Sequence, residues 1–218
     1  MRTTRRLLSC AAVALLAACG SVLQPSGDLA EALVVELPGY VAAAPGQIPL
    51  TLCDPLPSGT GPTPPPLSGE LGEPAAAFYQ TAPATLEAYA WRASAEAARA
   101  ADPDAAPDSD EEAARLFVED ARSAAAGCEF ELFTDADTDG DGMLDTGTSD
   151  VQSVEPWSGS GWEGVRIHRV VSGQEQTDRR LVYAGDVVLL VVMRADRDDP
   201  EILAPADDFL EAVAERLG

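Results

Sequence analysis

The chain contains no lysine and no asparagine, and its only histidine is His168. These absences exclude a phosphate-binding Gly-Lys-Ser/Thr loop and a histidine-based zinc cluster, and a dinucleotide-binding glycine fingerprint is missing as well. All 14 basic residues are arginines, against 37 aspartates and glutamates, for a net charge of −23. Such a charge repels phosphates, so we expect no nucleic acid and no anionic lipid headgroup as a partner. The acidity itself is typical of a protein that stays soluble outside the cell.

An apolar run long enough to span a membrane is also missing, because the N-terminal run covers only residues 7–18. It follows three arginines, which is the pattern of a secretory signal. The run ends in Leu16-Ala17-Ala18-Cys19, which resembles the bacterial lipobox, where the cysteine becomes an acylated N-terminus. We expect residues 1–18 to be a lipoprotein signal peptide and Cys19 to anchor the protein to the cell membrane through its lipid. The alternatives are an ordinary cleaved signal peptide and an uncleaved apolar start.

The rest of the chain has the size of one domain. Residues 19–27 are expected to be a lipidated tether, and residues 28–218 form a single extracytoplasmic domain. Two segments within it are expected to be loops: the proline-rich residues 55–66 and the acidic residues 135–148.

Cysteine is scarce, with four residues in all. Cys10 lies in the leader and Cys19 at the lipid site, so Cys53 and Cys128 are the two thiols that remain after export. In an oxidising compartment we expect them to form a disulfide, with Cα atoms within about 7 Å of each other. A catalytic cysteine is the alternative, although nothing in the sequence marks either thiol as activated.

Hydrophobic periodicity predicts an α+β domain. Helices are expected at residues 28–37, 94–101, 111–126 and 205–217. Strands are expected at residues 47–53, 86–93, 128–134, 151–157, 164–171 and 177–194, the last as a hairpin. Residues 187–193 (VVLLVVM) are apolar on both faces, which is typical of the most buried strand. This order predicts a single antiparallel sheet with helices packed on it.

Three segments resemble a known family. They are "LPGY" after the first expected helix, "ARSAAAGC" at the end of the third, and "RLVYAGDVVLLVVMRAD" before the last. These patches are similar to the actinobacterial sensor-domain lipoproteins, which in turn resemble the extracellular sensor domain of a mycobacterial Ser/Thr kinase. The resemblance implies a ligand-sensing or cell-envelope role and carries no catalytic residues. Family members usually have more extracytoplasmic cysteines than this chain.

The acidic loop has the spacing of a calcium site. Starting at Asp137, carboxylates stand at positions 1, 3, 5 and 9 and Gly142 at position 6, as in EF-hand-like and thrombospondin-type aspartate loops. The predicted calcium-binding residues are Asp137, Asp139, Asp141, Met143 and Asp145. Oxygen ligands at alternate positions can curl round a hard cation, and calcium is the only cofactor that the sequence suggests.

The calcium loop departs from the EF-hand pattern at position 12, where Thr148 replaces the bidentate glutamate. Asp150 or water would have to complete the coordination. A second register, starting at Asp135, also places carboxylates at positions 1, 3 and 5. The alternative is an acidic turn that binds nothing.

Signs of catalysis are few. His168 stands on an expected strand, where a structural role is favoured, and Ser158 and Ser160 do not fit the Gly-x-Ser-x-Gly nucleophile pattern. Trp157 and Trp162 flank the same Gly/Ser turn, and could form an aromatic lip for a glycan or peptide or, as we favour, pack in the core.

The sequence therefore predicts a lipid-anchored, non-enzymatic binding or sensing protein with an unidentified envelope ligand. The alternatives are a structural envelope lipoprotein and, less favoured, a hydrolase that uses His168 with one of the serines.

The calcium hypothesis makes a thermal prediction. Millimolar calcium should raise the melting temperature by binding the native state, while equal magnesium should not, because magnesium demands tighter octahedral geometry. Asp139→Ala with Asp141→Ala should abolish the shift and keep the fold. An unchanged melting temperature of the wild-type protein in calcium would leave an acidic turn.

Overall fold

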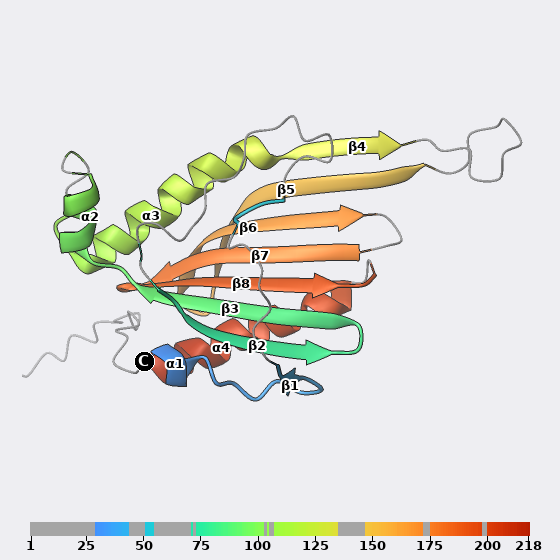
Figure 1. The fold of residues 1–218 in the computed structure, drawn as a ribbon, viewed down its shortest axis with the longest axis horizontal. Coiled ribbons are helices and arrows are strands. Elements are labelled where there is room, and N and C mark those ends of the chain that lie inside the picture. Colours follow the sequence, from blue (N-terminus) through green and yellow to red (C-terminus); the bar gives the residue numbers. More distant parts are fainter. Residues whose placement is uncertain are drawn as a thin grey trace, which may run out of the picture.

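In the residues that it describes, a computed structural model of the chain has one antiparallel sheet and four α-helices (Figure 1). The residues that the structure describes are 29–43, 51–54, 71, 73–102, 104, 107–134, 147–171, 175–197 and 200–218. The eight strands lie in the order β1-β2-β3-β8-β7-β6-β5-β4, and every neighbouring pair is antiparallel. The predicted α+β class with a single antiparallel sheet is confirmed.

The strands vary from two residues at one edge of the sheet to twelve near the other. They are β1 (Val41–Ala42), β2 (Ala75–Thr81), β3 (Ala84–Arg92), β4 (Phe130–Thr134), β5 (Thr148–Gly159), β6 (Trp162–Val171), β7 (Glu175–Ala184) and β8 (Val187–Ala195). The α-helices are α1 (Leu29–Ala32), α2 (Ala95–Ala101), α3 (Asp110–Ala125) and α4 (Pro205–Leu217), and 3-10 turns lie at η2 (Ala126–Cys128) and η3 (Pro200–Leu203).

The β7–β8 hairpin lies near the centre of the sheet, as its composition predicts. Gly185 begins the turn with φ +56°, a backbone conformation that glycine adopts at little cost. Every residue from Val187 to Met193 is buried, so β8 is covered on both faces.

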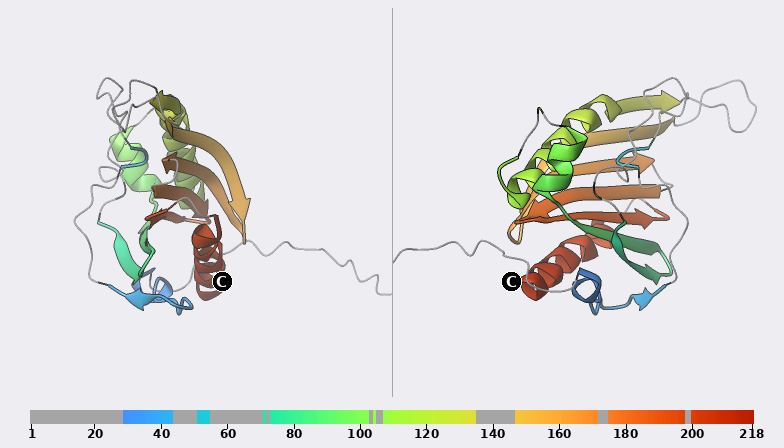
Figure 2. Two further views of the ribbon diagram at one scale, coloured as in Figure 1. Left: turned by 90° about the vertical axis from the view of Figure 1, so that its right-hand side faces the viewer. Right: turned by 60° about the vertical axis from the view of Figure 1, so that its left-hand side comes forward.

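Alternate side chains of β8 enter two separate hydrophobic cores, which we name the α4-side core and the α3-side core. The α4-side core contains Leu33, Tyr79, Leu86, Trp162, Leu189, Met193, Phe209 and Leu210. The α3-side core contains Cys53, Tyr89, Trp91, Ala114, Val118, Ile167, Leu181 and Leu190. In Figure 1, α3 lies in front of the sheet and α4 behind it, and Figure 2 gives the same arrangement from the side.

Two of the helices begin at serine caps. The Ser94 hydroxyl accepts a hydrogen bond from the Ala97 N–H at the start of α2, and the Ser109 hydroxyl accepts one from Glu112 at the start of α3. Asp110 joins the two helices, because its carboxylate accepts from the Ala95 N–H at 2.8 Å. The predicted helices at 94–101 and 111–126 are confirmed to within a residue, and the helix predicted at the C-terminus, with Pro205 near its start, is α4.

The β5–β6 hairpin turns at Ser160 and Gly161, whose φ values are +50° and +81°. Positive φ at both central residues is the backbone of a type I′ turn, which matches the twist of the flanking strands. On β6, Gly164 is required for a different reason: a Cβ there would lie 2.1 Å from the Leu181 carbonyl oxygen. The hairpin can therefore approach β7 closely only because this position has no side chain.

The predicted helix at 28–37 is wrong in length, since α1 ends at Ala32. The following residues are held by Tyr79 on β2, whose hydroxyl donates to the Leu33 carbonyl at 2.6 Å and accepts from the Val35 N–H at 2.8 Å. These backbone groups would otherwise continue the helix. The apolar spacing nevertheless predicted the buried positions of this segment, because Leu33 and Leu37 are both buried.

Two further differences concern the N-terminal half. Residues 44–50 of the predicted 47–53 strand lie outside the described residues, and residues 51–54 form no strand. The sequence also gave no sign of β1 or β2. Only Tyr79 of β2 is buried, and the other six residues of the strand are partly or fully exposed. Among the helices of the described residues, none has the length and apolar character needed to cross a membrane.

Candidate functional site

Two of the predicted sites lie outside the described residues. These are Cys19 and the calcium loop, with Asp137, Asp139, Asp141, Met143 and Asp145. In the part of the chain that is described, no group of three or more His, Cys, Asp or Glu side chains is arranged to hold a metal ion. Asp150, one of the two groups considered for completing the calcium coordination, accepts two hydrogen bonds from Arg169 at 2.9 and 2.7 Å. Its carboxylate is thus already engaged by a guanidinium.

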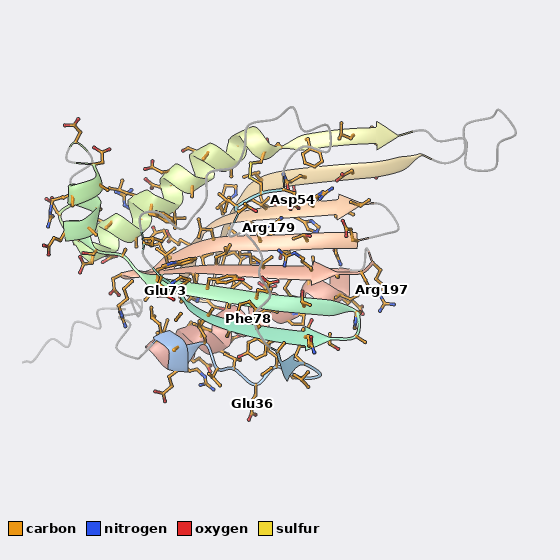
Figure 3. All side chains as sticks on the ribbon, in the orientation of Figure 1. Glu36, Asp54, Glu73, Phe78, Arg179 and Arg197 are labelled. Atoms are coloured by element: carbon orange, nitrogen blue, oxygen red, sulfur yellow. A yellow bond between two sulfur atoms is a disulfide. The ribbon has the colours of Figure 1, made fainter. Side chains whose placement is uncertain are left out.

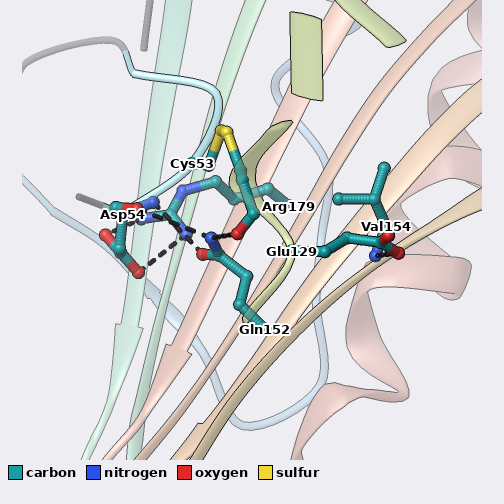
Figure 4. The surroundings of a disulfide bond; sticks show 7 residues. Cys53, Asp54, Glu129, Gln152, Val154 and Arg179 are labelled. Carbon is teal, nitrogen blue, oxygen red and sulfur yellow. Dashed lines mark hydrogen bonds and ion pairs between the residues drawn. A yellow bond between two sulfur atoms is a disulfide. The ribbon is translucent and has the colours of Figure 1, made fainter. Parts of the chain in front are cut away.

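The predicted cysteine pair lies at disulfide distance. Cys53 and Cys128 are bonded, with Cα atoms 6.3 Å apart, which agrees with the expected limit of about 7 Å (Figure 4). Cys128 belongs to η2 at the end of α3, and Cys53 to a short segment that packs in the α3-side core. The bond therefore fastens residues 51–54 beside the sheet.

A network of charges holds the same segment next to the disulfide. Asp54 accepts two hydrogen bonds from Arg179 of β7, at 2.6 and 3.0 Å, and is 3.4 Å from Arg169 of β6. Gln152 of β5 donates to the Cys128 carbonyl at 2.7 Å and accepts from the Asp54 N–H at 3.2 Å. Figure 3 labels Asp54 and Arg179 over the α3 side of the sheet, and Figure 4 enlarges their contacts.

The charges of this network shift two pKa values. Burial acts to raise the pKa of Asp54, but the hydrogen bonds and positive charges of Arg179 and Arg169 outweigh it, so its pKa lies below the ordinary value. The pKa of Arg169 is raised, first by its hydrogen bond to Asp150, so this guanidinium stays charged. Asp54 and Arg169 are therefore both charged at neutral pH.

A second network lies on the other face of the sheet, next to α4. Asp178 is wholly buried and accepts from Arg166 at 2.6 Å and from Arg180 at 3.0 Å. Arg180 also pairs with Asp207 of α4, and its guanidinium lies 5.1 Å from the ring of Trp157. The sequence did not predict either network, although the charged run Asp178-Arg179-Arg180 inside an expected strand was a visible signal.

His168 does not form the serine couple that the hydrolase alternative requires. Ser158 pairs with Glu163, five residues along β6 from His168, which corresponds to roughly 16 Å at the rise of a strand. The serine opposite His168 is Ser153, and its hydroxyl lies 3.4 Å from the His168 backbone carbonyl rather than its ring. Asp178, also opposite His168, has both carboxylate oxygens bonded to arginines.

The two tryptophans of the hairpin do not form an aromatic lip. Trp162 is buried in the α4-side core and donates its indole N–H to the Leu210 carbonyl at 3.0 Å. Trp157 packs against the same core, over Arg180. The favoured core-packing interpretation fits both residues.

The pocket with the most useful chemistry lies between α3 and the β5–β6 hairpin, and we name it the α3–hairpin pocket. It has a volume of about 300 Å3. It is lined by Val118, Glu119 and Arg122 of α3, Pro156, Trp157 and Ser158 of β5, Glu163 and Gly164 of β6, and Tyr183 of β7. Trp157 contributes from the strand itself, since its ring lies on the Arg180 side of the sheet.

The polar groups of this pocket carry both signs of charge. The Tyr183 hydroxyl donates to Glu163 at 3.2 Å, and burial followed by the charge of Glu163 raises the pKa of Tyr183. Glu119 is paired with Arg115 at 2.8 Å, and Arg122 lies one turn further along α3. The pocket thus offers Arg122 to an anionic group and Glu163 to a cation or a hydrogen-bond donor. Of its lining residues, sequence analysis singled out only Trp157 and Ser158, because the others come from separate elements that meet only in the folded chain.

A smaller pocket of about 140 Å3 lies between α2 and α3, with Leu71, Ala98, Leu116 and Phe117 among its lining residues. Its walls are mainly apolar, and the carboxylates at its rim are Asp102 and Asp120. Its polar lining residues are Ser94, Asp102 and Asp120, so it has no counterpart to Arg122 of the α3–hairpin pocket.

No protein-family model matches the chain, and comparison with curated proteins finds no match. The resemblance to sensor-domain lipoproteins therefore depends on the three sequence patches alone.

The Asp54 network predicts a pH-dependent loss of stability. Asp54→Asn should lower the free energy of unfolding by about 3 kcal/mol at neutral pH, because it leaves the buried Arg179 charge uncompensated. A folded-state pKa below the unfolded value stabilises the protein above about pH 4, and this contribution is lost as pH falls through the folded pKa. The difference between wild type and variant should therefore be constant above about pH 5 and shrink in more acidic buffer, in urea unfolding followed by circular dichroism.

Asp186→Asn is the matched control, because Asp186 pairs with Arg92 at a more exposed position. It should cost less than about 1 kcal/mol. Equal losses for the two variants, or a difference for Asp54→Asn that stays constant down to pH 2, would contradict the role given to Asp54.

Proposed function

We propose that this chain is a lipid-anchored binding or sensing protein of the cell envelope, without enzymatic activity of its own. The observation that carries the proposal is the α3–hairpin pocket, in which Arg122, Glu163 and Tyr183 meet beside Val118 and Pro156. Small-ligand sites combine apolar walls with a few convergent polar groups, and their volumes begin at about 300 Å3.

The location in the envelope is supported by the N-terminal sequence and by the cysteines. A basic and apolar leader ends at Cys19, in the pattern of a bacterial lipobox. The Cys53–Cys128 pair at disulfide distance fits an oxidising compartment, where such bonds persist. The resemblance to sensor-domain lipoproteins points to the same place and to a sensing role.

We further infer that the helices pack on the sheet as two layers, one on each face. Support comes from the two cores: Val118 of α3 shares one with Ile167 and Leu181, and Phe209 of α4 shares the other with Leu189. In this arrangement the α3–hairpin pocket is a gap between a helix layer and the end of a rigid hairpin, so its polar groups are held by secondary structure rather than by loops.

Binding rather than hydrolysis is favoured by the surroundings of His168. Ser158 lies at the far end of the hairpin from His168, and the carboxylate of Asp178 is taken by Arg166 and Arg180. A general base would need a nucleophile within hydrogen-bond reach.

The anchor is tested by replacing the cysteine of the lipobox. Cys19→Ala should move the protein from the membrane fraction to the soluble fraction or leave the leader uncleaved, since acyl chains supply the membrane affinity. Cys10→Ala, in the leader, is the matched control and should remain membrane-bound. Membrane retention and normal processing of Cys19→Ala would show that the anchor is elsewhere.

The binding role is tested by a thermal-shift screen of the full-length protein in detergent against peptide and glycan fragments of the cell wall. At least one fragment should raise the melting temperature, because a ligand at 100 times its Kd stabilises the native state by about 2.7 kcal/mol. Glu163→Gln and Arg122→Ala should each abolish the shift. Glu111→Gln, on an exposed position of α3, should leave it unchanged.

A shift that survives both pocket variants would place the ligand elsewhere on the protein. The absence of any shift across the panel would favour a structural role for the lipoprotein.

A further inference from the structure

The edge strand β4 exposes apolar side chains that the described residues do not cover. Only four large hydrophobic side chains in the described part of the chain are exposed, and two of them are neighbours on β4: Leu132, 37% exposed, and Phe133, 71% exposed. β4 is the last strand of the sheet and pairs only with β5 among the described strands. Large exposed apolar groups on a soluble protein commonly mark an interaction surface.

The backbone of β4 is suited to receive another strand. It pairs with β5 in an unbroken register from Phe130 to Thr134, with no bulge. Every second residue of an antiparallel edge strand turns its N–H and C=O groups away from its neighbour. β4 has no proline, lysine or bulge to block such an edge, and its one charged side chain is Glu131.

The side chains of β4 alternate between the two faces of the sheet. Phe130 lies on the same side as Arg169, whose guanidinium is 5.9 Å from its ring. Glu131 and Phe133 therefore lie together on the opposite face, where both are exposed. A carboxylate beside an exposed aromatic ring suits a guanidinium or ammonium, which can pair with the first and stack on the second.

The charge of the sequence around β4 indicates which charge a partner segment should carry. Between Arg122 and Arg166 the chain has ten aspartates and glutamates and no basic residue. This segment includes all of β4 and β5. A second copy of the chain would bring the same acidic segment against itself, and the full sequence carries a net charge of −23, so self-pairing is disfavoured. A basic segment meets a complementary surface.

We propose that β4 is a docking edge for an extended, basic segment of a partner protein, which adds to the sheet as a further strand. Main-chain hydrogen bonds to β4 supply part of the affinity. Basic side chains opposite Glu131 and Phe133 supply the selectivity. This surface is separate from the α3–hairpin pocket, and the proposal does not depend on the proposed ligand.

The test uses the full-length protein in detergent and two synthetic peptides that alternate arginine or glutamate with valine. The basic peptide should bind in fluorescence anisotropy, more weakly at higher salt, and the acidic peptide should not. Phe133→Ser and Glu131→Arg should each weaken binding at least tenfold. Val34→Ser, which removes another exposed apolar side chain, in the segment between α1 and β1, is the matched control and should bind as wild type.

Hydrogen exchange distinguishes strand addition from loose electrostatic attraction. The basic peptide should slow the exchange of the backbone amides of residues 130–134. Binding that leaves these amides unchanged, equal affinity of wild type and Phe133→Ser, or no binding of the basic peptide would each overturn the proposal. A dimer in sedimentation that Phe133→Ser dissociates would overturn it too, because a second copy would then occupy the edge.

Discussion

The two-sided burial of β8 is the constraint on which the rest of the structure depends. Its seven residues Val187–Met193 are apolar without alternation, so neither face of the strand can meet water without exposing several aliphatic side chains. Each fully buried side chain of this size contributes roughly 1.5–3 kcal/mol, so both faces must be covered. This explains why the chain forms two cores from distant parts of the sequence: residues of α1, β2 and α4 join one, and α3 with the Cys53 segment joins the other.

The sheet cannot continue this apolar pattern through β7, where Gln176 to Arg180 are all buried and polar. Each of these charged side chains is paired on its own face of the sheet. Arg179 pairs with Asp54, and Asp178 pairs with Arg166 and Arg180. Burial of an unpaired charge is costly, so these pairs determine which segments may lie beside β7. The disulfide and the Asp54 pair act on the same four-residue segment, one by covalent linkage and the other by charge. The sheet thereby supports the α3–hairpin pocket and the exposed strand β4 at one end.

Much of this architecture could be predicted from local signals. An alanine-rich string predicted α2, an amphipathic pattern predicted α3 and a continuous apolar run predicted β8, while the two cysteines expected to remain after export predicted the disulfide. The predictions from sequence failed where a residue far away along the chain determines the local structure. The helix at 28–37 is cut short by Tyr79, which takes the backbone groups of Leu33 and Val35. The α3–hairpin pocket could not be predicted either, because β5, β6 and β7 meet α3 only after the sheet has formed. The aspartate loop that carries the calcium hypothesis lies outside the described residues.

We expect a stability gradient across the sheet, from the core built on β7 and β8 to the edge strand β4, where we propose that a partner docks. Native-state hydrogen exchange of the unliganded protein measures this gradient directly. The backbone amides of β7 and β8 should exchange only with global unfolding, whereas those of residues 130–134 should exchange with a much smaller opening free energy. Protection of the β4 amides equal to that of the β8 amides would contradict the account, because it would mean that the edge strand is already covered.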